Sequence, residues 1–315
     1  MRSEFQFIND MKSRYDLRRV GDDCAVLPKD DKTDLLITSD MLVEEVDFRL
    51  DWSNPEQIGH KCLAVSLSDI AAMGGTARFA MLSIAVVENL WKGDLLDRFY
   101  EGWNLLAAEF GVELIGGDIS STSGPLTVDS TVIGEVPRGQ ALLRAGARPG
   151  DAIFVTGSLG GAAGGLQLLL RGQHGSSENA QKLLEQQLTP RPELLAANQL
   201  RTHGLATAAI DLSDGLSSDL MHICEASGVG AEIDARSLPI EPALKEFFSA
   251  EECIELALNG GEDLRLLFTG DAERISAFGL AGVTQIGTVT SRSGRIELLD
   301  RGELRPISAA GYRHF

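Results

Sequence analysis

Apolar and polar residues follow patterns in the first half of the chain that predict both strands and helices. Short apolar runs bounded by glycine, proline or aspartate indicate strands, and longer segments with apolar residues at helical spacing indicate helices. We predict helices over residues 4–13, 56–73 and 92–110, and strands over residues 24–27, 35–37, 79–87, 112–115 and 126–136.

The second half of the chain continues this mixture of elements. We predict strands over residues 152–155, 206–210, 231–233 and 266–268, and helices over residues 178–189, 193–203 and 216–227. A Pro-Gly-Asp turn at 149–151 separates the halves, so we expect domains at 1–148 and 149–315. Because strands and helices do not alternate as regular βαβ units, each half is predicted to be an α+β domain.

The helix over 56–73 is apolar in nearly every direction around its axis. Between Cys62 and Ala77 the only charged residue is Asp69. A helix of this kind is interior, and an unpaired carboxylate inside a protein costs several kcal/mol. Asp69 therefore predicts a bound cation or ligand, and the alternative is an aspartate that is bonded only to backbone.

A strand-to-helix turn runs from Asp211 through Ser213 and Asp214. The N–H groups and the dipole at the start of the following helix favour anions. The alternative is that Ser213 or Asp214 only caps this helix.

Two glycine-containing segments allow a ligand to approach the backbone. Gly116 and Gly117 follow a strand and present Asp118, although an ordinary glycine turn is the alternative. The glycine-rich segment 157–165 has neither the Walker A pattern nor G-x-G-x-x-G spacing, so its glycines serve helix packing or line a nucleotide site.

Several charged residues have two open interpretations. Arg144 and Arg148 either contact phosphate or are solvated linker residues. Glu262 and Asp263 follow a glycine turn, and they face either a ligand or only the solvent.

Composition narrows the partners of the protein. The 315 residues carry a net charge of −18, which argues against binding nucleic acid or an anionic membrane. The uncharged segment 152–170 is broken by glycines and polar residues, so no membrane span is expected. The four cysteines are scattered and contain no C-x-x-C pair, which indicates reduced thiols and a cytoplasmic protein.

Acidic residues at the ends of predicted elements are expected to converge on one cleft. Carboxylates about 4 Å apart repel each other by about 4 kcal/mol at an effective dielectric constant of ~20, so such a cluster requires cations. Ligands that are all oxygen atoms favour Mg²⁺ over zinc. The acids concerned are Asp22, Asp23, Asp40, Asp69, Asp118, Asp211 and Asp214.

Taken together, the motifs resemble those of the thiamine-monophosphate kinases. The segments that carry the resemblance are 21–23 (GDD), 38–40 (TSD), 67–74 (LSDIAAMG), 116–118 (GGD), 211–216 (DLSDGL), 260–263 (GGED) and 311–315 (GYRHF). The resemblance implies the two-domain α+β fold of aminoimidazole ribonucleotide synthetase. In that fold the N-terminal domain forms a β-barrel across a homodimer and is flanked by helices, and the C-terminal domain is α+β.

The resemblance also implies an activity and a set of site residues. It implies ATP-dependent phosphorylation of thiamine monophosphate to thiamine diphosphate by direct in-line transfer, without a catalytic side chain or a phospho-enzyme. Several Mg²⁺ ions would be held by Asp23, Thr38, Ser39, Asp40, Asp69, Asp118, Asp211 and Asp214. ATP would contact Gly117, Asp118, Arg144, Ser213 and Tyr100, and the acceptor would contact Asp47, Glu262 and Tyr312.

Two positions depart from the family pattern and bear on the substrate. Asp47 stands where the family has histidine, and Leu264-Arg265 stands where it commonly has Tyr-Glu. Two alternative functions therefore stay open. One is another ATP-dependent enzyme of the same superfamily, and the other is a protein that binds nucleotide or thiamine phosphate without catalysis.

Overall fold

Strands of the first half form one sheet in the computed structural model, which describes residues 4–173, 175 and 177–312. The strands are β1 (Ala25–Pro28), β2 (Thr33–Val43), β3 (Thr76–Val86), β4 (Glu113–Ser121) and β5 (Thr127–Pro137). They are hydrogen-bonded in the order β1-β2-β5-β3-β4, with β3 and β4 parallel and the other pairs antiparallel. Within the described residues this sheet is open, and the two-chain barrel implied by the resemblance stays a prediction.

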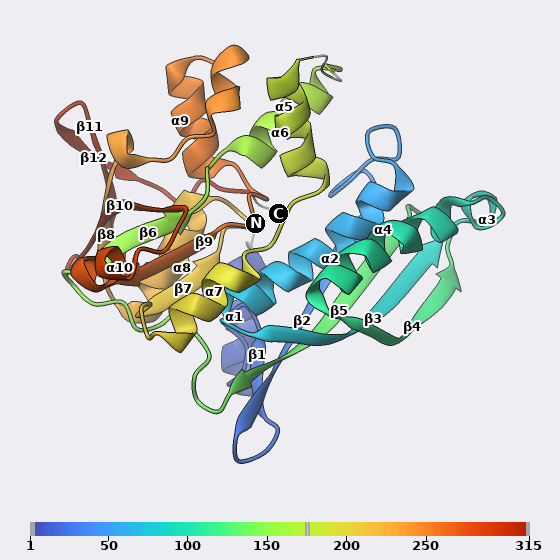
Figure 1. Cartoon of the computed structure of the whole chain (residues 1–315), viewed down its shortest axis with the longest axis horizontal. Helices are drawn as coiled ribbons and strands as arrows, with labels where there is room; N and C mark the ends of the chain where they lie inside the picture. The colour runs from blue at the N-terminus through green and yellow to red at the C-terminus, as the bar shows by residue number, and fades with distance from the viewer. Residues whose placement is uncertain (1–3, 174, 176, 313–315) are drawn as a thin grey trace.

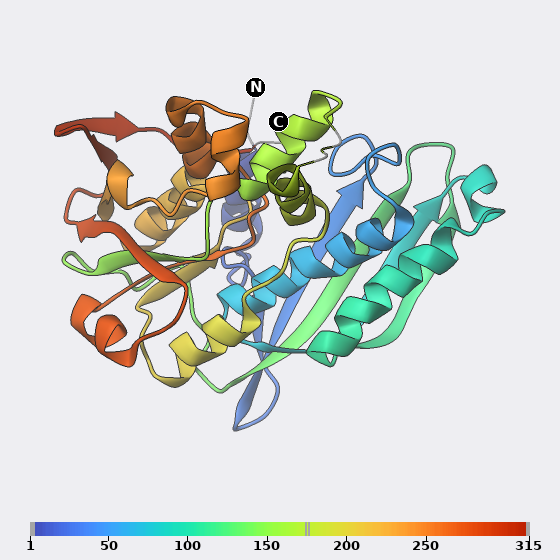
Figure 2. The same cartoon turned by 45° about the horizontal axis from the view of Figure 1, so that its top comes forward.

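Helices cover one face of this sheet, and no helix among the described residues covers the other face. The helices of the first half are α1 (Glu4–Tyr15), α2 (Pro55–Ala72), α3 (Glu88–Trp91) and α4 (Leu95–Phe110). Figure 2 shows α2 and α4 side by side across the sheet. On the opposite face Met41, Phe79 and Met81 are exposed.

The second half folds around a mixed sheet with the strand order β12-β11-β8-β10-β6-β9-β7. Its strands are β6 (Ala152–Thr156), β7 (Ala208–Asp211), β8 (Gly230–Asp234), β9 (Leu266–Gly270), β10 (Val283–Thr290), β11 (Ile296–Asp300) and β12 (Glu303–Ile307). Its helices are α5 (Gly161–Leu170), α6 (Glu178–Leu188), α7 (Leu194–Thr202), α8 (Leu216–Ser227), α9 (Ala250–Asn259) and α10 (Ala272–Phe278), with 3₁₀ turns at Ala235–Ser237 and Pro242–Glu246.

Helix α2 lies between the two halves (Figure 1). The side chain of its Asn54 cap accepts a bond from the Gln57 N–H at 2.8 Å, and the Asn54 N–H donates to Gln57 Oε1 at 3.0 Å. Ile70 of α2 shares one buried cluster with Leu200 of α7 and Phe268 of β9. The prediction of an interior helix is therefore confirmed, and Asp69 lies where the two halves meet.

Some element boundaries differ from the sequence prediction. Strand β4 continues through Gly116, Gly117 and Asp118, so the interpretation of the glycine pair as a turn is wrong. A Cβ on Gly117 would lie 1.9 Å from the Leu82 carbonyl oxygen, so this close strand pairing requires glycine. The helix predicted from residue 92 begins at Leu95, after the separate short helix α3.

The connection from β5 to β6 spans residues 138–151, and the predicted domain boundary at 148/149 falls inside it. Among the described residues, no helix combines the length and apolarity that a membrane crossing requires.

Candidate active site

Three aspartates from distant parts of the chain meet at the junction of the halves. Asp69 lies on α2, Asp211 is the last residue of β7, and Asp23 precedes β1. Each offers a carboxylate oxygen, and these oxygens all lie within 4.8 Å of one another. The predicted convergence of these acids is therefore found in the fold.

Hydroxyl groups donate to the carboxylates of this region. Thr38 of β2 donates to Asp69, and Ser68 of α2 donates to Asp211 at 2.6 Å. Ser66 of α2 likewise donates to Asp40 at 2.8 Å, which holds Asp40 on the α2 side of the sheet. These bonds fix the carboxylates without neutralising their charge.

Arg144 provides positive charge at the edge of the cluster. Its guanidinium donates two hydrogen bonds to one oxygen of Asp23, and its backbone N–H donates to Asp22 at 2.8 Å. Its side chain is 22% exposed. The interpretation of Arg144 as a solvated linker residue is therefore wrong.

The acids of the cluster are protonated more readily than ordinary aspartates. Burial, followed by repulsion from neighbouring acids such as Asp23, raises the pKa of Asp211 to about 7, although the Ser68 bond opposes this shift. Burial also raises the pKa of Asp40 to about 6 and the pKa of Asp69 well above its usual range. The pKa of Asp23 is raised by burial as well, although Arg144 opposes this.

The donor set fits a hard divalent cation. Asp23 Oδ2 is buried and has no hydrogen-bond partner within the described residues, and it belongs to a set of acidic groups close enough to share an ion. Carboxylate and hydroxyl oxygens are the ligands that Mg²⁺ prefers. An ion here would also relieve the repulsion among the buried carboxylates.

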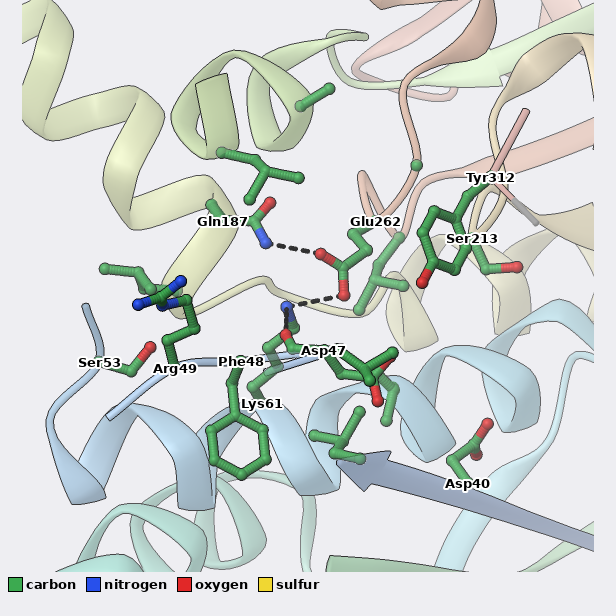
Figure 3. A pocket seen from close by; sticks show the side chains of 18 of the residues that line it. Asp40, Asp47, Phe48, Arg49, Ser53, Lys61, Gln187, Ser213, Glu262 and Tyr312 are labelled. Carbon is green, nitrogen blue, oxygen red and sulfur yellow. Dashed lines mark hydrogen bonds and ion pairs between the residues drawn. The ribbon is translucent and has the colours of Figure 1, made fainter. Parts of the chain in front are cut away.

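The acids open into a pocket of about 460 Å³ between the two halves. Asp40, Asp69, Asp211 and Asp214 line it, together with Ser213. The residues predicted to contact the acceptor also line this pocket, and Figure 3 shows them around it: Asp47, Glu262 and Tyr312. One pocket thus joins four of the predicted metal residues to the predicted acceptor residues.

The turn before α8 is held by a residue that the sequence analysis did not single out. The N-cap is Gly215, with φ +116°, and it makes no side-chain cap. Instead, the buried Asp219 accepts from the backbone N–H groups of Gly215 at 3.0 Å and Asp214 at 3.3 Å. The alternative in which Ser213 or Asp214 caps the helix is therefore wrong.

Two further alternatives are resolved around helix α5. Asp263 is half-buried and accepts from the N–H groups of Gly160 at 2.6 Å and Ala162 at 3.1 Å, so its carboxylate holds the start of α5 and does not face only the solvent. A Cβ on Gly165 would lie 2.2 Å from the Leu183 carbonyl oxygen, which confirms tight helix packing at this glycine.

Two pocket residues were missed by the sequence analysis. Lys61 of α2 is 4% exposed and forms an ion pair with Glu262 at 2.7 Å, so the interpretation of Glu262 as solvent-facing is also wrong. Gln187 of α6 is likewise buried and donates to Glu262 at 2.6 Å. A lysine one residue before the apolar stretch of α2 was the available signal for Lys61.

Seven of the residues implied by the resemblance do not line this pocket. Asp23, Thr38 and Arg144 adjoin the cluster of acids, whereas the other four lie elsewhere in the single chain. Ser39 accompanies Asp129 and Thr131 on the uncovered face of β2 and β5. Gly117 and Asp118 lie on the edge strand β4, and Tyr100 packs beside Phe99 on α4.

Comparisons with known proteins agree over most of the chain. Two family descriptions match, AIR synthase related protein, N-terminal domain, over residues 21–136, and AIR synthase related protein, C-terminal domain, over residues 148–298. Thiamine-monophosphate kinase of Escherichia coli (strain K12) is 39% identical over 313 residues, covering 96% of this chain and 94% of that protein. Its counterpart in Bacillus subtilis (strain 168) is 38% identical over 306 residues, covering 94% and 93%.

A solved structure of AaThiL complexed with AMPPCP and TMP has a TM-score of 0.90 and 33% identity with this chain. The match covers 99% of this chain and 97% of that chain. With its two α+β halves folded as in AIR synthase related proteins, the chain belongs to the thiamine-monophosphate kinase family.

Proposed function

We propose that this protein transfers the terminal phosphoryl group of ATP to thiamine monophosphate, which gives thiamine diphosphate and ADP. The observation that carries this proposal is that one pocket is lined both by the acids Asp40, Asp69 and Asp211 and by the acceptor candidates Glu262 and Tyr312. Phosphoryl transfer needs alignment and charge neutralisation more than a covalent catalyst, and this arrangement offers both.

Several Mg²⁺ ions complete the proposed site, and when bound they neutralise phosphate charge. One ion would be held by Asp23, Asp69 and Asp211, whose carboxylate oxygens lie close together. Further ligands nearby would be Thr38, Asp40 and Asp214. The chain orients these groups in advance through Thr38, Ser66 and Ser68.

Arg144 and Ser213, which lie near the acids, are proposed to align the nucleotide. Arg144 is poised beside Asp23 to offset negative charge on ATP, and Ser213 presents its hydroxyl and backbone at the α8 turn. No side chain is required to accept the phosphoryl group. The transfer is therefore proposed to be direct, from ATP to the acceptor phosphate.

At the acceptor end, Asp47 stabilises the loop that follows β2 and also lines the pocket. Its carboxylate accepts from the Val43 N–H at 2.8 Å, which closes the turn that follows β2. We propose that Asp47, Glu262 and Tyr312 surround the ring system of the acceptor, where the aromatic ring of Tyr312 favours a cationic thiazolium.

We propose that Asp118 takes part in this scheme through a homodimer. Asp118 pairs with Ser83, Ser83 with Asp129, and Asp129 with Met41. Three strand spacings separate Asp118 from Met41 by about 14 Å, and directly paired residues share a face of the sheet. The side chain of Asp118 therefore lies on the uncovered face, while Asp40 bonds to Ser66 on the α2 side.

We accordingly propose that a second copy of the chain covers this face and forms the two-chain barrel. The exposed apolar side chains there support the proposal, because a free sheet face of this kind favours association. They are Met41, Phe79 and Met81. Gly117 and Asp118 of one copy would then serve the site of the other.

Mixed dimers test this arrangement. Asp69→Asn and Asp118→Asn are each expected to be inactive, and exchanging their subunits is expected to restore about a quarter of wild-type activity, because half the dimers then hold one intact site. Sites built from one chain would leave the mixture as inactive as its parents. Subunit exchange is verified by mass spectrometry of differently tagged copies.

The activity itself is tested with purified protein, ATP, Mg²⁺ and thiamine monophosphate. We expect thiamine diphosphate to accumulate and to stop accumulating when EDTA removes the metal. Product formation no greater than in the EDTA control would refute the proposal.

The four cysteines are free and buried, which supports the further proposal of a cytoplasmic location.

A further inference from the structure

A buried lysine lies at the acceptor end of the pocket, where the phosphoryl transfer makes no use of it. Lys61 lines the pocket from α2 although its side chain is only 4% exposed. Lysine is almost never buried without a partner, because its ammonium group loses its hydration. The contacts of Lys61 therefore indicate its role in the pocket.

Lys61 is part of a polar network that joins four segments of the chain. Its Nζ lies 2.7 Å from Glu262 Oε1 and donates to the Asp47 carbonyl oxygen at 3.2 Å. Glu262 Oε2 accepts from Gln187 Nε2 at 2.6 Å. Figure 3 shows this network beside the pocket, with Glu262 held through both of its carboxylate oxygens.

The backbone of Glu262 is fixed as firmly as its side chain. Its φ is +68°, a left-handed conformation that costs free energy for a residue other than glycine. Its N–H donates to the Ser213 carbonyl oxygen at 2.8 Å, which ties it to the α8 turn. The fold thus holds this carboxylate in one orientation.

The distance along α2 indicates which part of the acceptor reaches Glu262. Lys61, Val65 and Asp69 all line the pocket and follow one another at four-residue spacing. Eight residues of α-helix span about 12 Å, so Lys61 lies that far from the acids. An acceptor whose phosphate lies at the acidic end therefore extends its ring system towards Lys61 and Glu262.

We propose that Lys61 and Gln187 are positioning residues for Glu262, whose carboxylate accepts a hydrogen bond from the ring amino group of the acceptor. A carboxylate has about four lone-pair sites, and Lys61 and Gln187 occupy one on each oxygen. The sites that are left can receive an amino-substituted heteroaromatic ring. The inference rests on the proposed function, because it takes the acceptor to be thiamine monophosphate.

Steady-state kinetics of Lys61→Met, Lys61→Arg, Glu262→Gln and the double variant Lys61→Met/Glu262→Gln test the inference. We expect Lys61→Met to raise the acceptor KM about 10- to 50-fold and to leave the ATP KM within about twofold. Lys61→Arg is expected to recover most of the loss. If Lys61 acts through Glu262, the double variant will be within about twofold of Glu262→Gln alone.

An acceptor whose ring amino group is replaced by hydroxyl provides the second readout. Wild type is expected to prefer the amino compound, and Lys61→Met is expected to lose most of that preference. Additive effects of Lys61→Met and Glu262→Gln, an unchanged preference, or a rise in the ATP KM alone would each overturn the inference.

Control variants separate positioning from folding. Lys182→Met removes a lysine of α6 that pairs with Glu241 and does not line the pocket. This variant is expected to leave the acceptor KM unchanged. If Lys61→Met does not fold, Gln187→Met is measured in its place and is expected to give a smaller rise in the acceptor KM. No rise with Gln187→Met would then overturn the inference.

Failure of the proposed function is recognised separately. It is shown by a folded wild-type protein that does not phosphorylate the acceptor. Calorimetry of thiamine monophosphate binding to wild type and to Lys61→Met still decides the inference in that case. Weaker binding by the variant supports it, and equal affinity or no binding to either protein overturns it.

Discussion

Two buried carboxylate sites in this protein have opposite surroundings. Glu241 accepts from the Ser158 hydroxyl at 2.6 Å, the Gln186 amide at 3.1 Å and the Ala243 N–H at 3.2 Å, and it pairs with Lys182 at 2.8 Å. Burial alone would raise its pKa, but these donors lower the pKa of Glu241 to about 2.

The acids at the junction of the halves have fewer donors and more like charges. Among the described residues, Asp69 accepts one hydroxyl hydrogen bond, from Thr38, and Asp211 accepts one, from Ser68. Their pKa values rise because burial and mutual repulsion exceed what these donors supply. A fully satisfied carboxylate holds the fold together, whereas a partly satisfied cluster stores repulsion that a bound cation relieves.

Removing one acid from the cluster gives the largest expected effect. Asp69→Asn is expected to lower kcat at least about 100-fold, because the site loses a charge that holds the metals. Its melting temperature without metal is expected to equal or exceed that of wild type, since one source of repulsion is gone. Steady-state kinetics and calorimetric unfolding measure the two effects, and a clearly lower melting temperature would contradict this account of the cluster.

Removing the charge of Glu241 is expected to have the reverse outcome. Glu241→Gln lowers the free energy of unfolding by about 2 kcal/mol, because buried donors lose a charged acceptor. The kcat of the folded variant stays close to wild type. Because the pKa of Glu241 is depressed, its contribution to stability is present above pH ~4.5 and is lost as the pH falls towards about 2. Urea unfolding with equal stability in both proteins would show that these donors contribute nothing.

The cluster is expected to give the opposite pH dependence. The pKa values of Asp40 and Asp211 are raised to about 6 and about 7, so the stability they contribute is present below pH ~4 and is lost as the pH rises through 6 and 7. Because Mg²⁺ requires deprotonated carboxylates, it should raise the melting temperature by roughly 3 °C or more at pH 8 and by less at pH 6. Asp69→Asn should flatten this difference, and a larger Mg²⁺ effect at pH 6 would contradict the account.

The smallest expected effect concerns the family histidine. The Asp47 carboxylate already bonds to the Val43 N–H, so Asp47→His exchanges one loop contact and leaves the acids unchanged. We expect the acceptor KM to change by less than about fivefold and the ATP KM to stay constant. A larger change in the acceptor KM would make Asp47 a determinant of substrate choice.

The second departure from the family pattern is Leu264-Arg265, of which Leu264 lines the pocket and Arg265 does not. Arg265 donates to Glu193 at 2.6 Å, in the segment that precedes α7. Arg265 stands where the family commonly has glutamate, and its positive charge is neutralised by this ion pair with Glu193.

Local pattern was sufficient to predict helices α1, α2, α4, α6, α7 and α8 and most strands, but it missed α9, α10 and the last three strands. An apolar helix is expected to be interior, and α2 confirms this, while the role of Asp69 in binding a cation stays a prediction. The polar ends of β2 and β4 could not be predicted, because pairing with β5 and β3 extends them through residues of low strand propensity.

The composition of the site was harder to predict where long-range packing decides it. Nothing local indicates that Asp263 holds α5, since its backbone partners Gly160 and Ala162 are brought near by the fold. Asp219 differs, because it lies only four residues after Gly215 and was a local signal that the sequence analysis missed. The faces of Ser39 and Asp118 depend on strand register, which a one-residue shift would reverse.

The most direct test of the central claim is a crystal structure with Mn²⁺ and a non-hydrolysable ATP analogue. Anomalous scattering locates Mn²⁺ independently of the protein coordinates. We expect peaks between the carboxylates of Asp23, Asp69 and Asp211, with the triphosphate bound against them. Peaks only at exposed surface acids, with the triphosphate elsewhere, would contradict the account.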